Sequence, residues 1–419
     1  MKRDLRRAIL TSGFCLLLFL GIVLLQNRAP LIFMYLVAED WYGEYATCVA
    51  YLTACGLLIA GMNIAPHLRT YGHFVMALGF FFIGMEEISW AQRLVGIRTP
   101  HVVAQVNYQS EINLHNTVNV EFMTIFCYGL IVWMFLVPLL RSRNGKVARW
   151  LAAFGIPDIT LAQTPPFVLA VIILLFDPLV NGEVGELVLG LAFVYWAAET
   201  YLKARGERRR RVSSLAFAAC LVVLITGLTA VLVVVGGDLN SYRRRLRHSA
   251  IVAYPSHGYN DQAATLFKHM INEPPNPIYQ DALFEYGLFL KRTQSPEADA
   301  VLERFLHERY RLTSGSHVLP DDHRRAGVAF KLLNDQENAA QAFRRALDID
   351  VQRLERAQKQ SERSPAMFSM ARTYFELGEF RLALKHANDA RELAQSSRDR
   401  LRIQEWVESI ERGPVQLIR

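Results

Sequence analysis

The chain has few cysteines and histidines, and neither residue type forms a recognisable ligand motif. Single cysteines in apolar runs make neither a disulfide framework nor a CxxC metal site, so we expect small buried side chains. A zinc centre is also disfavoured, because zinc usually takes several His or Cys ligands and only His115 is well placed. The cysteines are Cys15, Cys48, Cys55, Cys127 and Cys220.

No signal-peptide cleavage site of the A-x-A type follows the first apolar run, Ile9–Leu25, although the basic segment MKRDLRRA precedes it. We therefore interpret this run as an uncleaved membrane span. The net charge of +7 does not indicate nucleic-acid binding. Most of the early excess lies in loops beside apolar runs, where positive charge determines membrane topology.

Apolar runs dominate the chain as far as Gly236, whereas the remainder is polar and helix-favouring. A transmembrane helix needs about 20 mainly apolar residues. The sequence therefore predicts an all-α protein with a multi-pass membrane domain at 1–240. We expect seven spans, with six as the alternative because the fifth and sixth runs are short. The runs are Ile9–Leu25, Tyr45–Ala65, Phe74–Trp90, Phe122–Leu140, Phe167–Val180, Leu187–Leu202 and Leu215–Val235.

Basic residues alternate between the predicted loops and thereby orient the membrane domain. The N-terminus and the second, fourth and sixth connections are rich in Lys and Arg, whereas the odd connections carry few. Positive loops stay in the cytoplasm, so we expect a cytoplasmic N-terminus and, after seven spans, an extracytoplasmic C-terminal domain. The predicted location is a bacterial inner membrane. The basic run from Arg243 to Arg247 opposes this orientation.

The stretch from Gly84 to Asn116 holds the strongest candidate for a chemical site. It begins with Glu86 and Glu87 and ends with NYQSEINLHN, a segment rich in amides. Ionisable residues at membrane depth are costly and usually line a cavity or pair with one another. The predicted topology places further acidic residues on the same outer side: Glu39, Asp40, Glu44, Asp177, Glu183 and Glu186.

Three roles are open for this stretch. On one continuous helix Glu86, Ser89 and Arg93 share a stripe, so a structural pair of Glu86 with Arg93 is the first. The second is catalysis, with an imidazole held by a carboxylate as general acid or base. The third is a calcium-like divalent cation held through oxygen atoms. The candidate catalytic residues are Glu86, Glu87 and His115, and the candidate cation ligands are Glu111, Asp40 and Glu44.

EEISWAQR followed by NYQSEINLHN resembles a motif pair of uncharacterised bacterial multi-pass membrane proteins. This resemblance implies a membrane protein but no particular activity. The segment EDWYGEY also resembles the D-W-x-E calcium-binding stretch of the seven-span alkaline ceramidases, through Asp40, Trp41 and Glu44. Those hydrolases hold zinc with several histidines, including an HxxxH pair in the last span, whereas Leu215–Val235 has no ionisable residue. We therefore carry over no zinc ligand.

Four sets of residues recur at fixed spacings in the polar half, 249–419, which is the second predicted domain. Their offsets are 3, 4, 5, 4 and 3 residues, with small residues where helices approach one another. The sets resemble the tetratricopeptide repeat, which implies paired helices stacked as an α-solenoid. Asp399–Arg412 is then expected to be a capping helix. The sets start at Ile251, Tyr286, Gly327 and Ala371, and their turn residues are Gly258, Thr293, Asn334 and Gly378.

Two functions fit this sequence. In the first, an integral membrane protein presents an extracytoplasmic repeat domain to a protein or peptide partner in the cell envelope. In the second, the outer Glu, His and Asn residues serve a membrane-embedded enzyme of hydrolase type or a divalent-ion-dependent binding protein. The first assumes less, but a simple anchor needs one span rather than seven, which keeps the second open. A transporter comes third, because matching broken segments in two halves are missing.

Overall fold

The computed structural model is helical throughout the part of the chain that it describes, which confirms the all-α fold there. The chain divides into two compact units, Met1–Leu266 and Phe267–Arg419. The division falls inside α15 (Asn260–Asn272), later than the predicted limits of 1–240 and 249–419. One reason is that Gln262 Nε2 donates a 3.1 Å hydrogen bond to the carbonyl of Asn27 in the first unit. The described residues are 2–38, 41–97, 99–100, 122–143, 145–157, 159–176, 179, 183–206, 210–274, 276–311 and 319–412.

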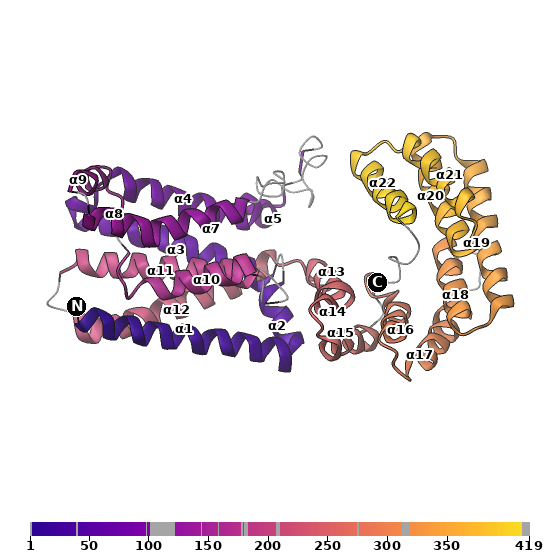
Figure 1. The fold of residues 1–419 in the computed structure, drawn as a ribbon, viewed down its shortest axis with the longest axis horizontal. Coiled ribbons are helices and arrows are strands. Elements are labelled where there is room, and N and C mark those ends of the chain that lie inside the picture. The colour runs from indigo at the N-terminus through magenta and orange to yellow at the C-terminus, as the bar shows by residue number, and fades with distance from the viewer. Residues whose placement is uncertain are drawn as a thin grey trace. The chain divides into compact units, whose positions relative to one another are not determined.

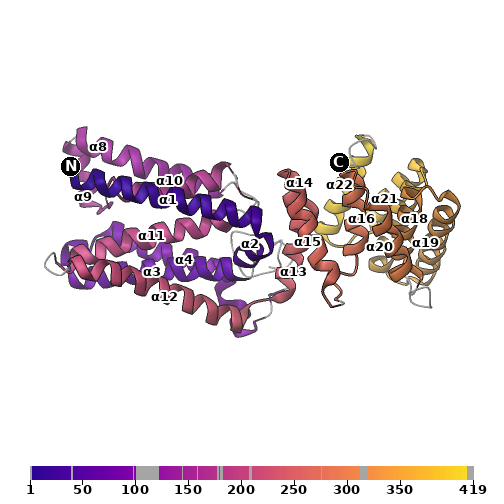
Figure 2. The same cartoon turned by 90° about the horizontal axis from the view of Figure 1, so that it is seen from below.

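The first unit is a bundle of apolar helices that lie side by side (Figures 1 and 2). Its long elements are α1 (Lys2–Arg28), α3 (Tyr42–Ile64), α4 (Tyr71–Glu87), α7 (Phe122–Ile131), η3 (Val132–Leu136), α8 (Val137–Arg143), α10 (Thr164–Phe176), α11 (Glu183–Ala204) and α12 (Arg210–Gly236). Helix α3 packs against α4, α11 and α12, while α10 packs against α1, α7 and α11. Each predicted apolar run overlaps one of these elements. Short helices join them: α2 (Pro30–Val37), η1 (Pro66–Leu68), η2 (Ser89–Ala91), α5 (Gln92–Val95) and α9 (Gly145–Ala153).

Several bundle helices have the length and composition of membrane spans. Three qualify alone among the described residues, and a fourth is added if the bent pair Cys220–Gly236 and Leu239–Ser256 is one span. The three are Asp4–Arg28, Tyr42–Ile64 and Glu183–Ala204. Helices α4 and α10 have only 17 and 13 residues, whereas a span needs about 20. The helices therefore indicate membrane association, and a count of seven spans goes beyond them.

The second unit is a succession of amphipathic helices, each packed against its neighbour in the chain. Alanines allow the close contacts: Ala326, Ala329 and Ala342 are buried in one cluster, and Ala371, Ala387 and Ala390 in a second. The helices are α16 (Ala282–Arg292), α17 (Ala298–Phe305), η6 (Leu306–Arg311), α18 (Pro320–Leu332), α19 (Gln336–Arg356), α20 (Gln360–Glu376), α21 (Phe380–Leu393) and α22 (Ser397–Glu411).

Three of the predicted turn residues share one backbone conformation. The angle φ is +78° at Gly258, +62° at Asn334 and +80° at Gly378, the left-handed conformation typical of helix C-termini. In the second set the positive φ, +56°, belongs to Gln294 instead of Thr293. The predicted turn residue is therefore wrong by one position in that set.

The turn of the second set lies one residue later than its spacing predicts, because Gly287, rather than Tyr286, lies where its two helices cross. A Cβ atom at Gly287 would lie 2.5 Å from Leu302 Cδ2, just as one at Gly327 would lie 2.5 Å from Phe343 Cε1. Leu302 follows Gly287 by 15 residues, whereas Phe343 follows Gly327 by 16. The second set is thus one residue shorter between its crossing points, and no inspection of spacing alone reveals which residue is lost.

Substitutions at the second turn test this register. Gln294→Gly is expected to stabilise the protein by up to about 1 kcal/mol, because glycine adopts positive φ without a Cβ penalty. Thr293→Gly is the matched control and should destabilise, since Thr293 Oγ1 donates a 3.0 Å hydrogen bond to the Phe289 carbonyl at the end of α16. Hydrogen exchange of α16 and α17 in the full-length protein measures both effects. The opposite order of stabilities would contradict the register.

Candidate functional site

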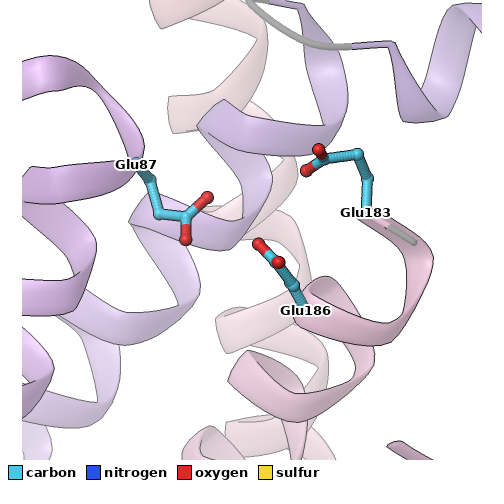
Figure 3. Close-up of side chains that lie close together, drawn as sticks. All are labelled: Glu87, Glu183 and Glu186. Carbon is cyan, nitrogen blue, oxygen red and sulfur yellow. The ribbon is translucent and has the colours of Figure 1, made fainter. Parts of the chain in front are cut away.

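Glu87, Glu183 and Glu186 bring three carboxylates together in the first unit (Figure 3). Glu87 is the last residue of α4, and the other two lie in the first turn of α11. One carboxylate oxygen of each residue lies within 4.8 Å of those of the other two. All three side chains are half-buried. We call these three residues the acidic cluster.

Close packing on α3 positions both halves of the acidic cluster. A Cβ atom at Gly84, in α4, would lie 3.2 Å from the carbonyl oxygen of Cys48 in α3. A Cβ atom at Gly190, in α11, would lie 3.1 Å from the Cβ atom of Ala50. Small residues allow helices in membranes to approach this closely. Helix α3 therefore brings the end of α4 and the start of α11 to the same region.

Helix α4 ends at Glu87 because the next turn is left-handed. The angle φ is +48° at Ser89, +56° at Trp90 and +60° at Ala91. Residues other than glycine rarely adopt these angles, and such strain is concentrated at functional sites. Trp90 Nε1 donates a 2.5 Å hydrogen bond to Glu86 Oε1, and Glu86 is buried. The strained turn thus fixes Glu86 beside, but outside, the acidic cluster.

The prediction that Glu86, Ser89 and Arg93 share a stripe of one continuous helix is wrong. The left-handed turn at Ser89, Trp90 and Ala91 interrupts the helix between them. The side chain of Arg93 lies outside the described residues, so its pairing with Glu86 stays a prediction.

The other predicted site residues are placed as follows. Glu44 lies in the first turn of α3. Neither Glu44 nor Glu86 joins the acidic cluster, which is the only carboxylate, His or Cys group with metal-ligand spacing among the described residues. Asp40, Glu111 and His115 lie outside the described residues, so their roles as ligands or catalytic groups stay predictions.

The sequence predicts that Glu183 and Glu186 lie on the outer side of the membrane domain, but it indicates no role for them. Their spacing of three residues at the start of a helix places both carboxylates on one face, and this arrangement can be predicted from the sequence. Their proximity to Glu87 cannot be predicted from residue spacing. It depends on how α4 and α11 pack on α3.

The acidic cluster offers only oxygen ligands, which suit a hard divalent cation such as Ca²⁺ or Mg²⁺. Three carboxylates this close repel one another, and a bound cation, shared protons or a neighbouring basic group can offset that repulsion. The N-terminus of α11 also favours negative charge at Glu183 and Glu186. The cluster therefore has ligands suited to cation binding or proton sharing. No known protein family, no curated protein and no solved structure matches this chain.

Proposed function

We propose that this chain is an integral membrane protein whose second unit binds a protein or peptide partner outside the cytoplasm. The supporting observation is that the first helices of successive helix pairs lie next to each other. Arg324 on α18 donates a 3.2 Å hydrogen bond to Ser369 Oγ on α20, and Lys331 Nζ donates to the Glu376 carbonyl at 3.1 Å. Helices stacked in this way offer a continuous binding surface, as tetratricopeptide-like solenoids do.

The membrane part of the proposal has seven spans and an extracytoplasmic second unit. In its favour, every predicted apolar run overlaps a helix, and these helices lie side by side (Figures 1 and 2). The alternation of basic and neutral loops supports a cytoplasmic N-terminus. A C-terminal reporter that is active only outside the cytoplasm should then be active, and an inactive one would refute this topology.

Photo-crosslinking tests the binding surface. A photo-reactive residue in place of exposed Arg372, on α20, is expected to give a discrete adduct with one partner in living cells. The matched control replaces exposed Lys385 on α21, a second helix of a pair, and should give no such adduct. Equal adducts at both positions, or none at Arg372 and at the other exposed positions of α18 and α20, would contradict the proposed surface.

A second candidate function is binding of a divalent cation, favoured by the convergence of Glu87 with Glu183 and Glu186. A pure anchor gains nothing from three neighbouring carboxylates, because ionisable groups at membrane depth are costly. A cation bound there would link the end of α4 to the start of α11. This would serve either a structural role or a binding site on the outer side of the bundle.

A further inference from the structure

The segment that follows the last apolar helix is strongly basic. It comprises α13 (Leu239–His248), the π-helical turn η5 (Ser249–Ala253) and α14 (Tyr254–Ser256). Residues 239–260 contain no Asp or Glu. Their basic residues are Arg243, Arg244, Arg245, Arg247, His248 and His257.

The chain turns by 99° between Gly236 at the end of α12 and Leu239 at the start of α13. Two glycines permit this turn beside a crowded surface. A Cβ atom at Gly236 would lie 2.6 Å from the Tyr45 hydroxyl, and one at Gly237 would lie 3.0 Å from the Trp41 ring. Because α12 is apolar and α13 runs nearly perpendicular to it, a membrane-spanning α12 lays α13 along the membrane surface.

The packing of α13 fixes which side carries its charges. Tyr242 packs against Trp41 and Tyr35, with ring centroids 5.7 and 6.0 Å apart, and Leu246 is fully buried. Tyr and Trp are enriched where a membrane meets water, which agrees with this position. The side chain of Arg244 is 59% exposed, although it also pairs with Asp238 at 3.2 Å. The apolar side of α13 thus faces the rest of the first unit. Of its arginines, Arg244 is exposed, while Arg243, Arg245 and Arg247 are half-buried and have further interactions.

We propose that α13 lies on the membrane surface and binds the phosphate groups of anionic phospholipids through its arginines. The inference rests on the proposed membrane position of the first unit. A guanidinium group donates several hydrogen bonds in a planar fork that matches a phosphate. Each Arg near an anionic membrane surface strengthens the attraction roughly fivefold. On this proposal the arginines serve lipid binding, and they need not mark the cytoplasmic side.

Spin-labelled lipids test this in vesicles containing the full-length protein. We expect motionally restricted phosphatidylglycerol to exceed restricted phosphatidylcholine around the wild-type protein. In the variant that combines Arg243→Gln, Arg244→Gln, Arg245→Gln and Arg247→Gln, this selectivity should fall severalfold. Replacing the same four residues by Lys should restore part of it, because the charge is retained and the planar guanidinium fork is lost. The matched control changes four exposed arginines of the second unit to Gln and should keep wild-type selectivity: Arg344, Arg345, Arg356 and Arg363.

The outcomes separate this inference from the membrane proposal. If the wild-type protein does not float with phosphatidylcholine vesicles, the membrane position itself fails. If it floats but the α13 variant has wild-type selectivity, or loses no more than the control variant, lipid binding by α13 is overturned. If the Gln variant does not float at all, the Lys variant decides, because a Lys variant that floats without any selectivity for phosphatidylglycerol also overturns the inference.

Discussion

The Asp350→Asn variant is expected to be more stable than the wild-type protein at pH 8, by about 2 kcal/mol, and about equally stable at pH 4. Asp350 lies in α19 and is 0% exposed. Within the described part of the chain, neither of its carboxylate oxygens accepts a hydrogen bond of good geometry. The Arg353 guanidinium pairs with it only at 3.7 Å. The charged carboxylate is therefore poorly compensated, and removing the charge should help the fold.

Burial raises the pKa of the Asp350 carboxyl to about 6, although the Ser369 hydroxyl and the charges of Arg324 and Arg353 act to lower that pKa. In an unfolded chain the pKa of Asp is about 3.9, so the folded protein holds this proton more tightly. The contribution of protonated Asp350 to stability is complete below about pH 4 and is lost as the pH rises through about 6. Asparagine does not titrate, so the advantage of the variant should appear over that window and then stay constant.

Hydrogen exchange of α18, α19 and α20 in the full-length protein measures this effect, with variant and wild type compared at each pH. The matched control is Asp348→Asn, which removes the same charge from an exposed position of the same helix. It should change exchange little at either pH. Faster exchange in Asp350→Asn than in the wild type at pH 8 would show that Asp350 stabilises the fold as an anion.

Local patterns were sufficient to locate the helices. Apolar runs of nearly spanning length overlap the helices of the first unit, and a Gly or Asn at three of the predicted turns has positive φ. These features depend on neighbours within a few residues, which is why they can be read from spacing. Gln294 shows the limit, because its side chain gives no sign of the left-handed conformation that it adopts. The contact of Gly287 with Leu302 sets that register.

Only part of the candidate site could be predicted from the sequence, because the rest depends on contacts between residues far apart in the chain. Glu87 attracts notice as a carboxylate at the end of an apolar run, but its neighbours come from a helix almost a hundred residues later in the chain. The left-handed turn at Ser89, Trp90 and Ala91 contains no glycine or proline, the usual signals of a helix end. Long-range packing on α3 therefore decided which carboxylates meet, and the predicted helical stripe could not anticipate it.

Calcium is expected to raise the Tm of the wild-type protein in detergent if the acidic cluster binds a divalent cation. A ligand at a hundred times its Kd stabilises the folded state by about 2.7 kcal/mol, which corresponds to several degrees. The variant combining Glu87→Gln, Glu183→Gln and Glu186→Gln should lose this shift, because amides supply no negative charge for the cation. Magnesium, with its stricter octahedral geometry, should give a smaller shift.

The same triple variant also has an expected Tm in the absence of calcium. Its Tm should exceed that of the cation-free wild-type protein, because three neighbouring carboxylates repel one another and three amides do not. Glu199→Gln is the control, since Glu199 lies in α11 beyond the cluster and pairs with Lys203 at 3.8 Å. It should keep the full calcium shift, and Glu44→Gln tests the ligand expected from the sequence. A calcium shift that survives in the triple variant would place the cation elsewhere. A wild-type protein with no shift, and a triple variant with a higher Tm, would instead show carboxylates that share protons.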